Sequence, residues 1–94
     1  MQMNKWGTVL TGRRLGKDVR KALLNQIGSN IIVIDFNGVR VVSHSFCDEA
    51  FGKMVFEVEE PKSKIKFINT DNTTKIVIKH VMSERLREKQ LNLV

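Results

Sequence analysis

The chain has 94 residues, 41% of them hydrophobic and 28% charged, and its formal net charge at pH 7 is +6. This length and composition suit one domain with a single core and exclude disordered and fibrous classes. The longest apolar run, residues 31–34, is too short to span a bilayer, and the first residues lack the apolar core of a signal peptide. The single cysteine excludes an internal disulfide and suits a reducing compartment. We therefore expect a single domain over residues 1–94, located in the cytoplasm and without a membrane partner.

The first predicted elements are a strand and a helix. Residues 6–10 predict a short strand, which Thr11-Gly12 ends. From residue 13 to about residue 27, apolar residues recur every four positions, which predicts an amphipathic helix. Thr11 is a suitable N-cap, and Gly28 stands where a left-handed C-terminal glycine belongs.

Residues 31–36 predict the central strand. They are apolar apart from Asp35, rich in β-branched side chains, and lack the alternation of a half-exposed strand. Such a run is typical of a strand covered on both faces, as in sheets with helical crossovers. Asn37-Gly38 then predicts a turn, and residues 39–42 form either a short extra strand or a packed loop.

A second helix is predicted from residue 46 to about residue 58. Its first turn contains Asp48 and Glu49, which favour the positive end of the helix dipole, and either Ser43 or Ser45 is expected to cap it. Gly52 within the helix predicts close packing against a neighbouring element. The predicted apolar stripe comprises Phe46, Ala50 and Met54.

The remaining chain predicts a third strand and a third helix. Pro61 ends the second helix, and residues 62–68 alternate as an edge strand with Ile65 and Phe67 facing inward. A polar turn leads to a last helix from about residue 73 to residue 90. The order of elements predicts an α/β fold, a small single domain with a mixed sheet of about four strands and three helices.

Several short motifs together resemble a known family, the STAS-like domains. These are small bacterial and phage-borne proteins, distantly similar to sulfate-transporter and anti-sigma-factor-antagonist (STAS) domains. The likeness covers nearly the whole chain and is most specific over residues 34–53. The motifs that carry it are Thr11-Gly12-Arg13 with Gly16, Val33-Ile34-Asp35-Phe36 with Gly38, Ser45-Phe46, Asp48-Glu49 and Phe51-Gly52-Lys53.

The resemblance implies a regulatory protein-interaction module that is not an enzyme and needs no cofactor. In the antagonist branch, an ATP-binding anti-sigma factor of the histidine-kinase-like class phosphorylates a serine at the start of the second helix. The phosphate then breaks the complex between the two proteins, because it adds negative charge at the contact surface. Such a regulator is therefore the expected partner.

By this resemblance, His44 stands where the antagonists have the phosphorylated serine, and it is flanked here by Ser43 and Ser45. We expect the partner to bind at the loop and helix start over residues 43–49, with a phosphorylation switch at one of the two serines. His44 itself could act as a pH-sensitive contact, since the unperturbed pKa of histidine is about 6.5. Asp35 is expected to organise the loop by accepting backbone N–H groups. The predicted site residues are Ser43, His44, Ser45, Asp48, Glu49 and Asp35.

Catalytic and metal sites are less well supported by the residues. His44, Cys47 and Asp35 could approach one another, but the pattern offers no oxyanion pocket, and Cys47 is more typical of a core residue. The soft ligands His44, Cys47 and His80 lack the paired spacing of a zinc site, and His80 is expected to be packed. We therefore predict no catalytic residue and no metal ligand.

The alternative function is nucleic-acid binding by a basic helix face. Such a face is also typical of a solvated helix surface. Sequence-specific readout is not expected, because helix-turn-helix spacing, an aromatic platform and tyrosine are all absent. The residues of the proposed face are Arg13, Arg14, Lys17, Arg20 and Lys21, and Lys62, Lys64 and Lys66 of the third predicted strand could add to it.

Overall fold

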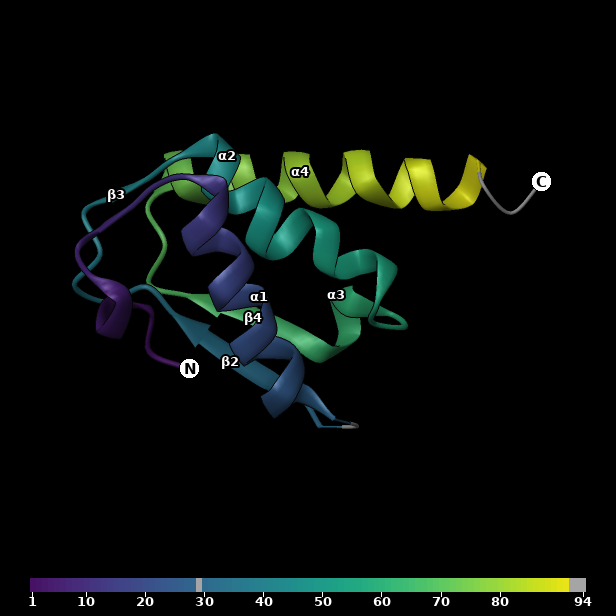
Figure 1. The fold of residues 1–94 in the computed structure, drawn as a ribbon, viewed down its shortest axis with the longest axis horizontal. Coiled ribbons are helices and arrows are strands. Elements are labelled where there is room, and N and C mark those ends of the chain that lie inside the picture. Colours follow the sequence, from purple (N-terminus) through teal and green to yellow (C-terminus); the bar gives the residue numbers. More distant parts are fainter. Residues whose placement is uncertain (29, 92–94) are drawn as a thin grey trace.

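Two short parallel sheets and a layer of helices make up the fold (Figure 1). The structure, a computed structural model, describes residues 1–28 and 30–91. In one sheet β1 (Val9–Leu10) pairs with β3 (Val41–Val42), and in the other β2 (Ile32–Asp35) pairs with β4 (Ile65–Ile68). The expected α/β class is confirmed, but the four strands of the described chain form two parallel pairs instead of one mixed sheet.

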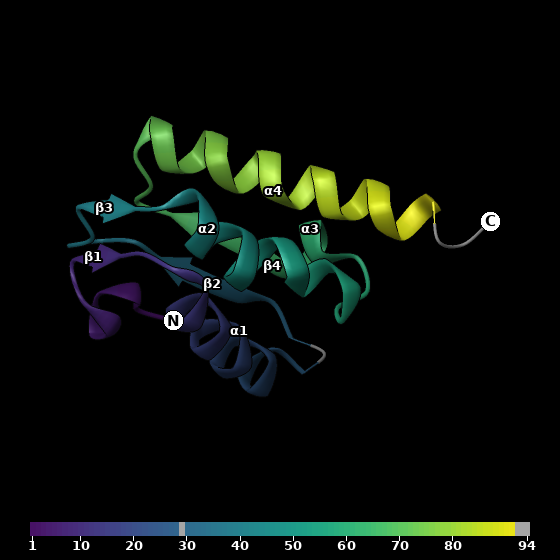
Figure 2. The ribbon, with the colours of Figure 1, turned by 45° about the horizontal axis from the view of Figure 1, so that its top comes forward.

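The helical layer is built around one continuous helical run in the middle of the chain. Its first part, α2 (His44–Cys47), continues into a π turn, η2 (Asp48–Gly52), and then into a 3-10 turn, η3 (Lys53–Phe56). Figure 2 shows this central run between α1 and α4, which both pack against η2. The other helical segments are η1 (Met3–Trp6), α1 (Arg13–Ile27), α3 (Pro61–Lys64) and α4 (Asn72–Leu91).

The α1 helix has the bounds that its apolar spacing predicts. Because the apolar residues recur every four positions, one helix face can be removed from water as a whole. Gly28 ends the helix with a positive φ of 46°, but its ψ of -127° lies outside the left-handed helical region that was expected. Gly12, not Thr11, takes the N-cap position, where its φ of 86° favours glycine. The fully buried core side chains include Val19, Leu23, Ile34, Phe46 and Phe51.

The prediction that the central strand is covered on both faces is wrong. Burial alternates along β2, and its outward-facing Val33 is 40% exposed. Ile31, just before the strand, is 60% exposed. The buried side chains of β2 and β4 share one face with the helices, so alternate residues on the opposite face meet water.

Three other predicted boundaries differ from the structure. The strand expected over residues 6–10 is limited to β1, because η1 takes up the preceding turn. The strand expected over residues 62–68 begins late, because Pro61 starts the one-turn helix α3, where its missing N–H costs no hydrogen bond. The helix expected over residues 46–58 spans residues 44–56 and changes its winding twice.

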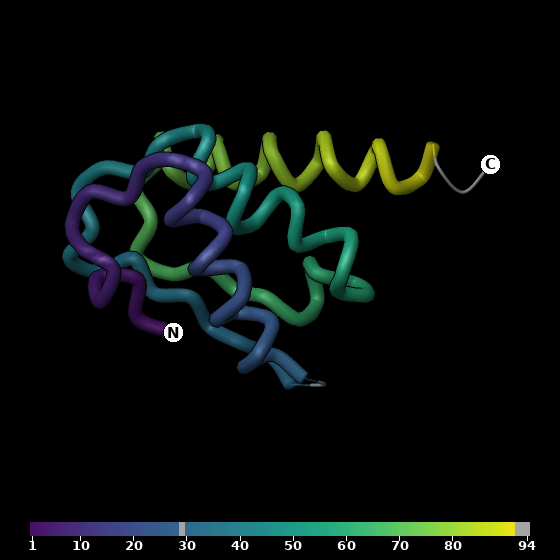
Figure 3. The backbone as a smooth tube through the Cα atoms, in the orientation of Figure 1, coloured from purple at the N-terminus to yellow at the C-terminus, as the bar shows by residue number. Residues whose placement is uncertain are grey.

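The last helix, α4, is one residue longer at each end than predicted. Asp71 caps it by accepting the Thr74 N–H at 2.7 Å. Figure 3 shows α4 running along the molecule, with its last described turns extending past the other elements. No helix of the described residues is both long enough and apolar enough to cross a membrane. Its buried residues are Thr74, Ile78, Val81 and Met82.

Candidate functional site

Ser43 caps the central helical run. Its Oγ accepts the Phe46 N–H at 3.1 Å and the Gly12 N–H at 3.2 Å. The same oxygen lies 3.3 Å from Oγ of Ser45. Ser43 rather than Ser45 is therefore the N-cap, and its hydroxyl also ties the start of α1 to the start of α2. Ser45 is half-buried, and in the described structure its hydroxyl hydrogen-bonds only to Ser43.

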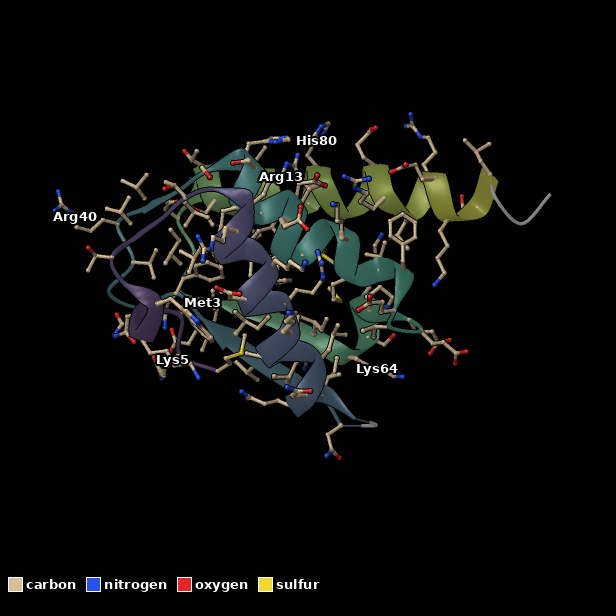
Figure 4. All side chains as sticks on the ribbon, viewed as in Figure 1. Met3, Lys5, Arg13, Arg40, Lys64 and His80 are labelled. Atoms are coloured by element: carbon tan, nitrogen blue, oxygen red, sulfur yellow. The ribbon has the colours of Figure 1, made fainter. Side chains whose placement is uncertain are left out.

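Two imidazoles stand beside this loop. His44 and His80 are both exposed, and their ring centroids are 5.9 Å apart with an interplanar angle of 52°. Figure 4 shows His80 on α4 directed away from the body of the molecule. The expectation that His80 is packed is wrong, because the buried face of α4 is set by Ile78 and Val81. A helical wheel anchored on these two residues places position 80 on the outer face.

Behind the loop, Asp48 is buried and held by two arginines. The Asp48 side chain is 10% exposed. Arg85 of α4 binds this carboxylate through two hydrogen bonds: Nε donates to Oδ1 at 2.9 Å, and Nη2 donates to Oδ2 at 2.6 Å. Nη1 of Arg13, on α1, donates to the same Oδ2 at 2.9 Å. Bidentate arginine pairs are among the strong hydrogen bonds of proteins, so Asp48 joins α1, η2 and α4.

Glu49 extends this network about two turns further along the same face of α1, to Arg20. Its carboxylate accepts Arg20 Nη1 at 3.0 Å and Lys53 Nζ at 3.0 Å. Arg13 Nη1 lies 3.2 Å from Oε1, which links the two carboxylates, and Arg20 also donates to the Glu49 carbonyl oxygen. Within the described chain, no buried side-chain nitrogen or oxygen atom lacks a hydrogen-bond partner.

This arrangement corrects two expectations. As whole residues, Asp48 and Glu49 are only 7% and 6% exposed. They therefore anchor the loop from inside and do not present their carboxylates to a partner. Arg13 and Arg20 are engaged with these carboxylates and are not part of an open basic face. Arg14, Lys17 and Lys21 are the exposed cations of the predicted basic face that form no ion pair within the described residues.

The ion pairs shift the pKa values of their members. Hydrogen bonds from Arg85 and then Arg13 outweigh burial and lower the pKa of Asp48 to about 2. Burial acts to raise the pKa of Glu49, but hydrogen bonds from Lys53, Arg20 and Arg13 outweigh it and lower that pKa to about 2. Hydrogen bonds to Asp48 raise the pKa of Arg85. Both carboxylates are therefore ionised at neutral pH.

We expect the free energy of unfolding to fall as the pH drops from about 5 to about 2. Both carboxyls have a lower pKa in the folded chain, so their stabilisation is complete above the unfolded values and is lost as pH falls through about 2. The expected loss is about 2 kcal/mol or more. Urea unfolding across this pH range measures it, and a double variant, Asp48→Asn with Glu49→Gln, should give a flatter profile. A wild-type profile as flat as that of the variant would contradict this prediction.

Asp35 lies away from the predicted loop. Its Oδ1 accepts the Asn69 side-chain N–H at 2.8 Å and the Asn37 backbone N–H at 2.9 Å, and Gln2 donates to Oδ2 at 3.3 Å. These bonds, led by that from Asn69, lower its pKa. Asp35 does organise a turn through a backbone N–H, but that turn follows β2 and is not the Ser43 loop. The expectation that it shapes that loop is wrong.

Cys47 is fully buried beneath the candidate site. Burial raises the pKa of its thiol to about 12, so the thiol is protonated at neutral pH. Among the described residues, no group of three or more histidine, cysteine, aspartate or glutamate side chains is arranged to hold a metal ion.

We expect a disulfide reagent such as DTNB to label Cys47 at least about 100-fold more slowly in the folded protein than in urea. Both the burial and the protonated thiol slow the attack. Equal labelling rates in the two conditions would show that the thiol is accessible in the native state. The absorbance of the released thiolate gives the rate directly.

The parallel strands, the helical layer and the capped loop at the start of the central run define a small α/β domain of the STAS-like class. The family model described as STAS-like domain of unknown function (DUF4325) matches residues 11–75, and the chain belongs to this family. The predicted resemblance is thereby confirmed. Comparisons with curated proteins and with solved structures found no significant match. His80 and Arg85 lie outside the matched range, so α4 completes both the imidazole pair and the ion network from beyond it.

Proposed function

We propose that the protein is a cytoplasmic regulatory module that binds a protein partner through the loop and helix start at residues 43–45, together with His80. The proposal rests on one observation. The exposed imidazoles of His44 and His80 lie beside each other at a loop that is fixed from inside by the buried ion pairs of Asp48. The buried carboxylates link α1, η2 and α4, so they hold the loop in one position before the partner arrives. A preorganised surface loses less conformational freedom on binding, which favours its use as a contact site.

Ser45 is the better candidate for a phosphorylation switch. The Ser43 hydroxyl already holds two backbone N–H groups, so esterifying it would disturb the cap of the central run. The Ser45 hydroxyl contacts only Ser43 in the described structure, and its loss leaves the cap in place.

A phosphate on Ser45 would lie about one helical turn before the buried carboxylates. It would compete with them for Arg13, whose side chain is 52% exposed. The added negative charge would also repel an acidic partner surface. By the STAS resemblance, the proposed partner is an ATP-binding regulator of the histidine-kinase-like class.

Affinity purification with tagged variants tests the proposal. We expect the wild type to recover a specific partner, and His44→Ala and Ser45→Asp to lower its recovery at least tenfold. Ser45→Ala and Ser63→Asp are matched controls, because the first adds no charge and the second adds the same charge on exposed α3. These two should behave as the wild type. Equal recovery by all five proteins would contradict the proposal.

A second experiment tests the switch itself. The recovered partner, incubated with the wild type and ATP, should add one phosphate to the peptide containing Ser45, as measured by mass spectrometry. Ser45→Ala should remove the signal. If the phosphate is found on another residue and partner binding is lost, the interaction site stands, but the assignment of the switch to Ser45 is wrong.

Nucleic-acid binding remains the alternative proposal, with three exposed cations on α1 that form no ion pair within the described residues. Arg14, Lys17 and Lys21 are too few for tight binding, because each neutralised phosphate contributes separately to the salt-dependent affinity. A gel shift at two salt concentrations separates the two functions. Affinity that is lost in a Lys17→Glu, Lys21→Glu variant and falls steeply with salt would favour nucleic acid.

A further inference from the structure

The two edges of the β2–β4 sheet differ in whether another segment of the chain pairs with them. Along β2, the Met1 amino group donates to the Val33 carbonyl at 2.6 Å, and the Asp35 N–H donates to the Met1 carbonyl at 2.9 Å. Gln2 forms a bridge with Asp35 in the same place. Along β4, the described residues place no strand on the edge away from β2. The backbone groups along that edge therefore have no strand partner among the described residues and could pair with an added strand.

A groove with an apolar floor runs between β4 and α4. It consists of two adjoining cavities of about 190 and 350 Å³, and both are lined by Phe67 and Lys79. We call it the β4–α4 groove. The remaining lining residues are Thr70, Lys75 and Ile78 in the first cavity, and Lys62, Ile65, Met82 and Ser83 in the second.

The charge around this groove has one sign. Lys62, Lys75 and Lys79 line it and are exposed, and Lys64 and Lys66 lie on the adjacent α3 and β4. No carboxylate lines either cavity, and none pairs with these lysines in the described part of the chain. Figure 4 shows Lys64 at the periphery of the molecule, near the start of β4. An acidic occupant would complement this charge.

We infer that the β4–α4 groove binds an extended acidic segment of a protein partner, which adds a strand to the open edge of β4. Backbone hydrogen bonds along β4 would supply affinity, and alternate apolar side chains of the segment would enter the groove beside Phe67 and Met82. Acidic side chains between them would point to the opposite face of the added strand, the face on which Lys66 lies, and the lysines of the groove would attract the segment through its net negative charge. The length of β4 sets a segment of roughly five residues.

Two other occupants fit the groove less well. A second copy of the chain would bring the same lysines to the same edge, and like charges oppose that pairing. A single-stranded nucleic acid needs aromatic platforms for its bases, and Phe67 is the one aromatic residue that lines the two described cavities. The apolar floor and the free backbone edge both suit a peptide strand.

The inference concerns a different surface from the Ser43 loop and does not rest on the proposed function. The probe is a fluorescent peptide, Asp-Val-Glu-Val-Asp-Val-Glu, with binding followed by fluorescence polarisation and by amide shifts in NMR spectra. We expect saturable binding with shifts centred on β4 and α4. A Lys75→Glu, Lys79→Glu variant should weaken binding at least tenfold. The matched Lys17→Glu, Lys21→Glu variant and the Ser45→Asp variant should not.

Two further peptides separate strand addition from charge alone. A peptide with lysine in place of each acidic residue should not bind. The acidic peptide N-methylated at alternate residues keeps its charge but loses backbone donors, and it should bind at least tenfold more weakly. Equal binding of the N-methylated peptide, shifts confined to α1, or no binding of the acidic peptide would overturn the inference. So would displacement of the acidic peptide by a tighter-binding oligonucleotide, or concentration-dependent dimerisation through β4.

Discussion

Asp48→Asn should lower the free energy of unfolding by roughly 3 kcal/mol, because it leaves two guanidinium groups facing a neutral amide in a buried position. Removing one member of a buried pair typically costs about 3–5 kcal/mol. The lower end applies here, since the Arg85 side chain is 23% exposed and regains some water. For a domain of this size the melting temperature should fall by about 12 °C or more. Urea and thermal unfolding both measure the change.

Asp18→Asn is the matched control for this prediction. It makes the same chemical change on the exposed surface of α1, where the expected effect is within about 0.5 kcal/mol. If the two variants lose the same stability, the buried ion network does not hold α1 and α4 on the central run. If Asp48→Asn is stable but fails to recover the partner, the network acts on the site and not on the fold.

Gly16→Ala should destabilise the protein by about 2 kcal/mol, although alanine is the better helix former. A Cβ at position 16 would lie 2.8 Å from the Phe46 carbonyl oxygen and 2.8 Å from Cβ of Glu49. These atoms belong to the buried central run and have no room to move. The α1 helix must therefore shift outward, which also lengthens the pair between Arg20 and Glu49.

Asn25→Ala on the same helix separates packing from helix propensity. Asn25 is exposed, so this substitution should be neutral or stabilise by a few tenths of a kcal/mol. Differential scanning calorimetry of both variants gives the comparison. A Gly16→Ala protein as stable as the wild type would show that α1 and the central run are not in close contact at this point.

The close approach at Gly16 and the ion network have a common cause. The central run is enclosed by α1, by α4 and by the inner face of the sheet, so every residue from Phe46 to Gly52 is buried. The carboxylates in that stretch can be buried only if cations pair with them. Arg13, Arg20 and Arg85 form these ion pairs. The position of the Ser43 loop follows from this enclosed and paired helix.

Features set by near neighbours in the chain were predictable. The bounds of α1 follow from its apolar spacing, and a serine cap for the central run was expected, although the pattern did not decide between Ser43 and Ser45. Gly52 was expected to pack closely, and a Cβ there would meet Asp48 Oδ1 at 2.6 Å and Val81 at 3.3 Å. Pro61 was expected to interrupt the helix before it. In each case the signal in the sequence is the intrinsic shape of one residue or an interaction within a few residues, even where, as at Gly52, the contact itself is with a distant element.

The roles of Asp48 and Glu49 were not predictable from local pattern. Acidic residues in the first turn of a helix normally face solvent and interact with the helix dipole. Here the arginines that neutralise Asp48 lie 35 residues before it and 37 residues after it. Only the folded chain brings them together, so the sequence pattern indicated exposed contact residues where the structure has buried anchors.

The sequence by itself determined the α/β class, the STAS-like family and the local shape of the helices, because these depend on periodicity and on caps within a few residues. The tertiary structure alone decided that the strands form two pairs, that His80 lies beside His44, and that no strand of the described residues pairs with the outer edge of β4. Strand pairing and the ion pairs of Asp48 join residues more than thirty positions apart. Which of them form depends on how the helices pack together, and this is decided only when the whole chain folds.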